Sequence, residues 1–423
     1  MFDITNPVVK ELLLTGSFGL EKESLRVTGK GFMAQSPTPF SQNEQHIVRD
    51  FSENQVEINT PVASSPQEVV DMLDHYNGVV QRTLRTLVPQ EYLWPFSNPP
   101  YIKSEKDIPI AIFTGEMASK TIYREYLSDR YGRYKMAFSG IHFNYSFSDE
   151  LLQADFKAKG LDDFDAYKNQ LYVDLAQRAV AYGWIVTAIT AASPVVDSSF
   201  VEKGKTGIDL FQGLSTVRGS ELGYWNFFAP IFDYSNLNAY VDSIQHYADM
   251  GLIKYPSELY YPVRIKPHGA YGMDALRGGV SHIELRNIDL NPLTKEGIDV
   301  RDVLFCQLLL VWLASTPLQP FDVKDQVQAV QNFKNAAHFD LKTVKIVVPN
   351  GEVYDVRQAG INVIGFMQDF YQGFSTEIQE CLDFQLRKFT EGTCKYSYRV
   401  RQEYGEHFVE KGLDLAKRIQ EMY

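Results

Sequence analysis

Cysteine is scarce in this chain of 423 residues, which contains only Cys306, Cys381 and Cys394. Three thiols are too few for a disulfide framework in a protein of this length, and no two of them form a CxxC pair. Cys306 lies inside the apolar run LFCQLLLVWLA, where a buried structural thiol is the ordinary interpretation. The cysteines therefore indicate neither a disulfide-stabilised fold nor a thiolate metal site.

Long hydrophobic segments are also missing. The first residues, MFDITNPVVKELL, include early acidic side chains and lack the apolar core of a signal peptide. The longest apolar run extends from Val303 to Ala314, contains Gln307, and is too short to span a bilayer. We therefore expect a cytoplasmic protein with no membrane partner.

The chain has no excess of positive charge. Asp and Glu outnumber Lys and Arg by 53 to 41, which gives a net charge of −12. A surface of this sign repels phosphate backbones and anionic lipids, so we expect no nucleic-acid partner. The content of 44% hydrophobic residues, with 25 Tyr and 27 Phe, is sufficient for a large core and an aromatic pocket. A small charged ligand in a buried site remains compatible with this composition.

No low-complexity stretch, fixed-period repeat or flexible linker divides the sequence. Alternating polar and apolar residues predict strands, and apolar residues at helical spacing predict helices, so the fold class is α+β. The strands are expected at residues 18–28, 47–60, 139–147 and 280–290. The helices are expected from Ser65 to Leu87 and near residues 165–191, 300–315, 362–388 and 406–422.

The start of the first long helix can be read from its residues. Ser65 is predicted to cap the helix, and Pro66 occupies the first helical position, where its missing N–H is no loss. Glu68 would complete a capping box by binding the backbone N–H of the cap residue.

Polar residues gather on the predicted strands. Because side chains alternate on a strand, Glu21 and Glu23 share one face of GLEKESLRV, with Lys22 on the other. An E-K-E triplet is most often a solvated face, but here it lies within an otherwise apolar segment. In the second segment Asp50 and Glu57 are seven residues apart, so one of them must lie at a bend or bulge. In the strand over 139–147 one face carries His142, Asn144 and Ser146. In the strand over 280–290 one face carries His282, Glu284 and Arg286.

If these strands meet in one sheet, five carboxylates and an imidazole converge. Two carboxylates about 4 Å apart repel by roughly 4 kcal/mol at an effective dielectric constant of about 20. Divalent cations would relieve that repulsion, and oxygen ligands with one imidazole suit Mg²⁺ or Mn²⁺ better than zinc. Magnesium held by few protein ligands commonly binds phosphates as well, which suggests a nucleotide, with arginines to neutralise its charge. The sequence contains no Walker A loop and no GxGxxG.

Seven ordered motifs within residues 15–315 resemble the bacterial glutamate–cysteine ligase family, both its free-standing members and the ligase module of its bifunctional ones. They are GLEKESLRV, DFSENQVEINTP, LWPFSNPPYI, YREYLSDRYGRY, SGIHFNYSF, LRGGVSHIELRNIDLNP and the GID that follows. The region after about residue 320 resembles the family only in being mostly helical.

The resemblance implies a glutamine synthetase-like catalytic core, with a twisted, mainly antiparallel sheet and surrounding helices. It implies one catalytic domain over residues 1–423, whose motif-bearing core is about 15–315 and whose region 316–423 is mostly helical. The chain is short for a free-standing member, and nothing after residue 315 resembles an ATP-grasp ligase, so we expect no ATP-grasp module here.

The resemblance also implies the reaction and its residues. The γ-carboxylate of L-glutamate would be activated by ATP as an acyl phosphate and joined to the amine of L-cysteine, giving γ-glutamylcysteine, ADP and phosphate. The implied metal ligands are Glu21, Glu23, Asp50, Glu57, His142 and Glu284. The implied arginines at the substrates are Arg286, Arg218 and Arg124, and the implied acceptor pocket is Tyr123, Leu127, Tyr224 and Tyr260.

Three alternatives to cysteine ligation remain open. The chain could join glutamate to a different small amine, because a small pocket separates a thiol from a methyl group by only about 1–3 kcal/mol. It could be a silent relative that binds ligands without turnover, or a metal-dependent phosphohydrolase. An intact set of six metal ligands argues against the silent relative.

Overall fold

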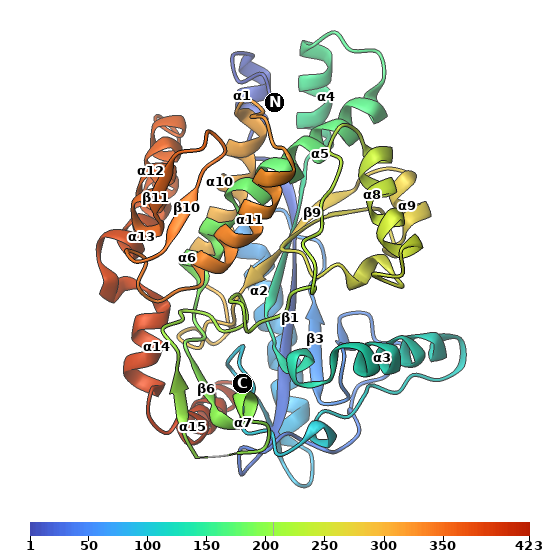
Figure 1. Ribbon diagram of the computed structural model, residues 1–423, viewed down its shortest axis with the longest axis vertical. Helices are drawn as coiled ribbons and strands as arrows, with labels where there is room; N and C mark the ends of the chain where they lie inside the picture. The colour runs from blue at the N-terminus through green and yellow to red at the C-terminus, as the bar shows by residue number, and fades with distance from the viewer. Residues whose placement is uncertain (206) are drawn as a thin grey trace.

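The computed structural model describes residues 1–205 and 207–423 and contains one large antiparallel sheet with helices packed around it (Figure 1). In spatial order its strands are β2 (Ile47–Arg49), β3 (Gln55–Asn59), β1 (Gly16–Thr28), β5 (Ile141–Phe147), β9 (His282–Ile288) and β8 (Val263–Lys266), with β4 (Glu91–Leu93) paired to the end of β1. Two small hairpins add β6 (Val195–Asp197) with β7 (Asp209–Phe211), and β10 (Lys345–Val347) with β11 (Val353–Asp355). The predicted α+β class with a mainly antiparallel sheet is confirmed.

Helices make up most of the remaining chain. The described α-helices are α1 (Pro7–Leu12), α2 (Pro66–Arg85), α3 (Ala118–Tyr131), α4 (Asp149–Ala158), α5 (Phe164–Tyr182), α6 (Trp184–Thr190), α7 (Ser198–Val201), α8 (Leu237–Asp249), α9 (Met273–Arg277), α10 (Val300–Ser315), α11 (Val323–Ala336), α12 (Val356–Phe370), α13 (Thr376–Thr390), α14 (Tyr396–Tyr404) and α15 (Phe408–Glu421). None of the helices in the described part of the chain combines the length and apolar character that a membrane crossing requires.

One face of the sheet is apolar and carries the main core. Leu20 on β1 pairs with Phe143 on β5, which pairs in turn with Leu285 on β9, and all three side chains are buried. Helices α2, α5 and α10 pack against these strands. Because neighbouring residues on a strand point to opposite faces, this arrangement leaves Glu21, Glu23 and Glu284 on the other, polar face.

The second predicted strand is wrong, because residues 47–60 form a hairpin of two strands, β2 and β3. The backbone N–H of Gln55 donates to the carbonyl of Ser52, which closes the turn between them. Asp50 lies just beyond β2, in the segment that leads into this turn, whereas Glu57 lies on β3. The expectation that one of these two acids lies at a bend is therefore confirmed for Asp50.

Two predicted helices are each split in two. The helix expected near 165–191 breaks at Gly183 between α5 and α6, where a Cβ would lie 2.4 Å from the carbonyl oxygen of Ala179. The helix expected near 362–388 is α12 followed by α13, separated by a turn in which Gly373 has φ of 83°. The helices near 300–315 and 406–422 are confirmed as α10 and α15.

The cap of α2 follows the prediction with one change. Ser65 accepts the N–H of Glu68 at 3.2 Å and Pro66 opens the helix, as expected. The carboxylate of Glu68 binds the backbone N–H and the hydroxyl of Ser64 at 2.7 Å, one residue earlier than the predicted partner.

The C-terminal helix α15 returns to the far end of β1. Phe408 packs edge-on against Trp94, with ring centroids 5.5 Å apart, and against Phe96 at 5.0 Å. Gly412 allows this approach, because a Cβ there would lie 2.4 Å from the Trp94 ring. These residues belong to a second apolar cluster that also includes Leu25 of β1.

Candidate active site

The polar face of the sheet carries a continuous row of ionisable side chains, set by the strand register. Glu57 on β3 pairs with Glu23 on β1, and Glu21 on β1 pairs with His142 on β5. Further along, Asn144 on β5 pairs with Glu284 on β9, which pairs with Arg264 on β8. Because paired residues in an antiparallel sheet point to the same face, segments far apart in sequence meet in one row.

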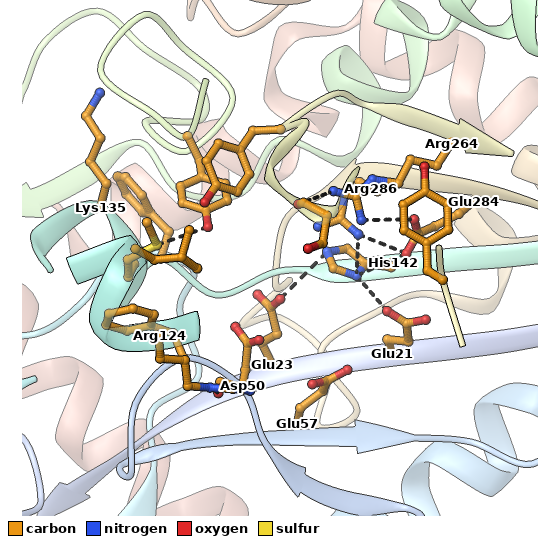
Figure 2. Close-up of a pocket in the computed structure, with 18 of the residues that line it drawn as sticks. Glu21, Glu23, Asp50, Glu57, Arg124, Lys135, His142, Arg264, Glu284 and Arg286 are labelled. Carbon is orange, nitrogen blue, oxygen red and sulfur yellow. Dashed lines mark hydrogen bonds and ion pairs between the residues drawn. The ribbon is translucent and has the colours of Figure 1, made fainter. Parts of the chain in front are cut away.

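His142 lies at the centre of this row, between three carboxylates that come from the two neighbouring strands β1 and β9 (Figure 2). Its Nδ1 is 2.8 Å from Glu21 Oε2 and 3.6 Å from Glu284 Oε1, and its Nε2 is 3.7 Å from Glu23 Oε1. Burial and the positive charge of Arg286 lower the pKa of His142, which outweighs the neighbouring carboxylates. A neutral imidazole is the form that can coordinate a metal ion.

One end of the row is compensated by cations. Arg286 donates to Glu284 at 2.9 Å, and Lys266 lies 3.7 Å from the same carboxylate. Burial alone would disfavour ionisation, but Arg286 and Lys266 hold the pKa of Glu284 well below its usual value. Glu21 also has a lowered pKa, because its bond to His142 offsets its burial and the charge of Glu284.

The other end of the row has too little positive charge. Burial and the charge of Asp50 raise the pKa of Glu23 to about 8 and raise that of Glu57 well above its usual value. Glu23 accepts one hydrogen bond, from the backbone N–H of Gly140 at 3.0 Å. Glu23 is buried and Asp50 and Glu57 are half-buried, and acids held so close together are costly unless a cation joins them. This end of the site is therefore the part that needs added positive charge.

The donor atoms fit a hard divalent cation. In the described part of the chain, Glu21, His142 and Glu284 each offer an atom that lies within 4.8 Å of the others. Glu284 Oε2 is buried and accepts no hydrogen bond from any residue that the structure describes. A buried carboxylate oxygen without a partner is costly in isolation, and a bound metal ion would satisfy it.

The three predicted arginines all line the site, but they are held differently. Arg286 points at Glu284, and Arg218 donates to the main-chain carbonyls of Arg286 at 2.8 Å and of Ile288 at 3.3 Å. Arg124 donates to the carbonyls of Asp50 at 2.5 Å, Arg49 at 3.3 Å and Lys120 at 3.0 Å. Its guanidinium therefore fixes the segment that carries Asp50.

Three tyrosines and a leucine, which we call the aromatic wall, line one part of the site. Tyr123 and Leu127 come from α3, while Tyr224 and Tyr260 come from two loops and lie with ring centroids 4.0 Å apart. The Tyr123 hydroxyl is 2.8 Å from the Ser257 hydroxyl. Burial raises the pKa of Tyr123 to about 12, so these phenols are neutral near pH 7.

A single cavity of about 280 Å³ unites all of these groups. Its lining includes every residue that was predicted to bind a metal ion or a substrate: Glu21, Glu23, Asp50, Glu57, Tyr123, Arg124, Leu127, His142, Arg218, Tyr224, Tyr260, Glu284 and Arg286. A second cavity of about 330 Å³ adjoins it and shares Glu57 and Arg124.

Several lining residues were missed by the sequence reasoning. Arg264 and Lys266 alternate on β8 within PVRIKP, and the same period-two argument that found Glu284 and Arg286 would have found them. Ser257, Met136 and Tyr271 also line the cavity. Ser257 and Met136 lie in short 3₁₀ helices and Tyr271 lies in a loop, where no periodicity marks them.

The sequence and the structure both match known proteins. The sequence model of the glutamate-cysteine ligase family matches residues 2–256 and 229–336. The bifunctional glutathione biosynthesis protein GshAB of Listeria monocytogenes serotype 4b is 32% identical over 98% of this chain and 56% of its own length. The GshAB protein of Clostridium perfringens strain 13 is 28% identical over 98% of this chain and 57% of its own length. The chain thus spans little more than half the length of these relatives.

Two solved structures share the fold. A bifunctional glutathione synthetase from Pasteurella multocida superposes with a TM-score of 0.84 and 26% identity, over 98% of this chain and 53% of that one. A glutamate–cysteine ligase from Francisella tularensis, crystallised with AMP, has a TM-score of 0.86 and 21% identity, over 96% of this chain and 89% of that one.

Proposed function

The chain belongs to the glutamate–cysteine ligase family, and from that premise we propose that it forms γ-glutamylcysteine from L-glutamate, L-cysteine and ATP. ADP and phosphate are the other products, and the reaction is the first step of glutathione biosynthesis. The observation that carries the proposal is one cavity lined by carboxylates, arginines and an aromatic wall, as such a three-substrate ligation requires. The proposal covers this first ligation alone and places it in the cytoplasm.

The reaction needs positioning and charge stabilisation rather than a protein nucleophile. The γ-carboxylate of glutamate attacks the terminal phosphorus of ATP, so that ADP leaves and an acyl phosphate forms. The cysteine amine then attacks the activated carbonyl carbon, and phosphate leaves as the amide bond forms. Holding these groups in line and neutralising charge on the phosphoryl oxygens are the effects that accelerate such transfers.

Arg286 is the group best placed to stabilise the transferring phosphoryl. Although it is buried, the charges of Glu284, Glu21 and Glu23 raise its pKa, so it stays cationic. Arg218, held by two main-chain carbonyls, presents a second fixed positive charge beside Glu23. Arg124 acts on Asp50 through the backbone and keeps that carboxylate at the site.

The carboxylate row would hold Mg²⁺, or Mn²⁺ in its place. We assign the ligands to Glu21, Glu23, Asp50, Glu57, His142 and Glu284, whose oxygen-rich set suits a hard cation. When bound, the metal neutralises the phosphate charge and polarises the transferring group. The raised pKa values of Glu23 and Glu57 support this assignment, because they mark negative charge with too little positive charge beside it. Glu284 Oε2 also supports it, because that oxygen accepts no hydrogen bond from the described residues.

The aromatic wall would receive the acceptor amino acid. Tyr123, Leu127, Tyr224 and Tyr260 enclose a small, mostly apolar space with neutral hydroxyls, which suits a thiol or a short alkyl side chain. L-Cysteine is the proposed acceptor, and 2-aminobutyrate is the expected side substrate, because a methyl group and a thiol differ little in size.

The test is an omission experiment on the purified chain. Phosphate release and formation of γ-glutamylcysteine, measured by mass spectrometry, should both require glutamate, cysteine, ATP and Mg²⁺ together. A panel of other amino acids and amines then ranks the acceptors. Unchanged phosphate release without cysteine or glutamate would identify a phosphohydrolase, a better acceptor would identify a different γ-glutamyl ligase, and ATP binding without turnover would identify a silent relative.

A matched pair of variants tests the metal assignment. Glu23→Gln keeps the size and the hydrogen bond from Gly140 but removes the negative charge, so turnover should fall at least about 1,000-fold. Glu380→Gln makes the same change on an exposed position of α13, and its turnover should equal that of the wild type. Activity of Glu23→Gln near the wild-type rate would contradict the assignment.

A further inference from the structure

A buried carboxylate lies directly behind the aromatic wall, without lining the cavity itself. Glu258 ends the short 3₁₀ helix Pro256–Glu258, and its side chain is fully buried. One oxygen, Oε1, accepts the backbone N–H groups of Lys254 at 2.6 Å and Tyr255 at 2.9 Å. These bonds hold the loop that carries Ser257 and Tyr260.

The other oxygen of Glu258 faces helix α3. Oε2 accepts the hydroxyl of Tyr126 at 3.1 Å and that of Tyr131 at 3.3 Å. Arg130, between them in sequence, lies 3.9 Å from the same oxygen and donates to the carbonyl of Leu252 at 2.5 Å. Three side chains of α3 thus converge on one carboxylate that belongs to the facing loop.

The main chain of Glu258 reaches the third part of the wall. Its carbonyl accepts the side-chain N–H of Asn226 at 2.8 Å, and Asn226 accepts the backbone N–H of Tyr260 at 2.8 Å. Asn226 follows Tyr224 by two residues, so the Tyr224 loop is tied to the same point. All three segments that form the wall therefore meet at Glu258.

The contacts with Glu258 matter for α3 because this helix has little other packing to hold it in place. Figure 1 shows α3 extending to one side of the molecule, away from the helices α10, α12 and α13. Among its residues only Leu127 is classed as buried. A helix with so little apolar burial depends on specific polar contacts for its position, because burial is the main force that fixes surface helices.

We propose that Glu258 is a positioning residue that sets the width of the acceptor pocket, and thereby its selectivity for a small side chain. It clamps Tyr123 and Leu127 on α3 against Tyr260 and Tyr224 without touching the substrate. Hydrogen bonds to a charged acceptor are stronger than neutral ones, so four donors on one buried carboxylate make a stiff joint. The inference rests on the proposed function, since it assumes that the aromatic wall receives the acceptor amino acid.

The decisive variant removes the two hydroxyl contacts between α3 and Glu258 and leaves the ion pair of Arg130 in place. Tyr126→Phe combined with Tyr131→Phe removes both hydroxyls and leaves the bonds from Lys254 and Tyr255 intact, and neither tyrosine lines the cavity. The KM for cysteine should rise at least about tenfold, since even one such hydrogen bond is worth about that factor, while the KM values for glutamate and ATP stay within about twofold. The preference for cysteine over a larger amino acid such as methionine should narrow by a similar factor.

Two further proteins complete the test. Glu258→Gln keeps the shape of the carboxylate and should show the same selective rise in the KM for cysteine. Tyr354→Phe removes a tyrosine–carboxylate hydrogen bond on the surface, to Glu352 at 2.7 Å, and should leave every KM unchanged. If Glu258→Gln does not fold, the double tyrosine variant decides. Parallel rises in all three KM values, or no rise for cysteine, would overturn the proposal.

A readout independent of turnover separates this inference from the proposed function. Amide hydrogen exchange over residues 118–131 should quicken in the double tyrosine variant, while exchange over α5 stays as in the wild type. Quickened exchange with no γ-glutamyl product from any acceptor would refute the proposed function and leave the clamp standing as a structural joint without its role in selectivity. Unchanged exchange would refute the clamp.

Discussion

Gly140 lies between the carboxylate of Glu23 and the guanidinium of Arg218, and contacts both. Its backbone N–H donates to Glu23 Oε2 at 3.0 Å. A Cβ at this position would lie 2.3 Å from Arg218 Cζ and 2.4 Å from its Nη2, so a side chain here and the observed position of Arg218 exclude each other. The absence of a side chain at residue 140 is what allows the arginine to lie against the strand.

Gly140→Ala should therefore act through Arg218. The backbone N–H that binds Glu23 is retained, but the guanidinium must move, and misplacement by about 1 Å commonly costs about 100-fold in rate. We expect kcat/KM to fall by about that factor. In the Arg218→Ala background the same substitution should cost nothing further, because the clashing group is gone. Additive losses in this double-mutant cycle would contradict the explanation.

The position of some residues at the site could be predicted from the sequence, and the contacts of others could not. Glu21, Glu23 and Glu284 follow from the alternation of side chains on strands, which is local information. The contacts of Arg124 with the carbonyls of Arg49 and Asp50 join residues some 75 positions apart, and no spacing rule reveals them. Arg124 lies at the site, as predicted, but its hydrogen-bond partners are backbone carbonyls.

At the level of elements, the strands were predicted better than the turns and breaks that interrupt strands and helices. The strand over 139–147 was found because apolar and polar residues alternate without interruption from Ile141 to Phe147. The strands over 18–28 and 280–290 were found from shorter alternating runs, such as Ile283 to Arg286. The hairpin within 47–60 was missed because its turn, Ser52-Glu53-Asn54, contains neither glycine nor proline. The helix break at Gly183 was missed because apolar residues continue on both sides of it.

Helix α14 provides a test at this scale, because a buried lysine fixes its start. Lys395, which immediately precedes the helix, donates through Nζ to the carbonyl of Phe339 at 2.5 Å. Burial lowers the pKa of Lys395 to about 8, against 10.5 for an exposed lysine. Between these two values the unfolded chain binds more protons than the folded one, so this group increases stability as the pH rises through that range.

Lys395→Met should make this dependence visible. From pH 7 to pH 10 the free energy of unfolding of the wild type should rise relative to that of the variant, by about 2 kcal/mol. Urea denaturation of both proteins at the two pH values measures this difference, and ionisation of the tyrosines is common to both and cancels. A difference that does not change with pH would show that Lys395 titrates normally in the folded protein.

At the scale of the whole molecule, the residues that line the cavity of the candidate site all lie before residue 290. The C-terminal region is nevertheless packed against the same sheet. The sequence after about residue 320 contains none of the motifs, so it indicated only that this region is mostly helical. Its structural role depends on contacts such as those of Gln420, whose side chain donates to the carbonyls of Gln81 and Glu91. Such long-range packing has no signature in composition or spacing.

Removal of residues 407–423 tests whether the chain behaves as one catalytic unit. Helix α15 buries Phe408, Leu413, Leu415 and Ile419 against Trp94 and its neighbours. Each fully buried apolar side chain contributes roughly 1.5–3 kcal/mol, so their sum is similar to the whole stability of a typical domain, about 5–15 kcal/mol. The truncated chain should therefore lose turnover and its cooperative unfolding transition.

The point variant Phe408→Ala separates packing from loss of the whole helix. It should fold, with a free energy of unfolding lower by about 3–5 kcal/mol in urea denaturation, and with turnover retained where it is folded. A truncated chain that keeps its activity would instead show that residues 1–406 are sufficient for the site. Because the cluster beneath α15 includes Leu25 of β1, the strand that carries Glu21 and Glu23, we expect the carboxylate row to lose its geometry when this helix is removed.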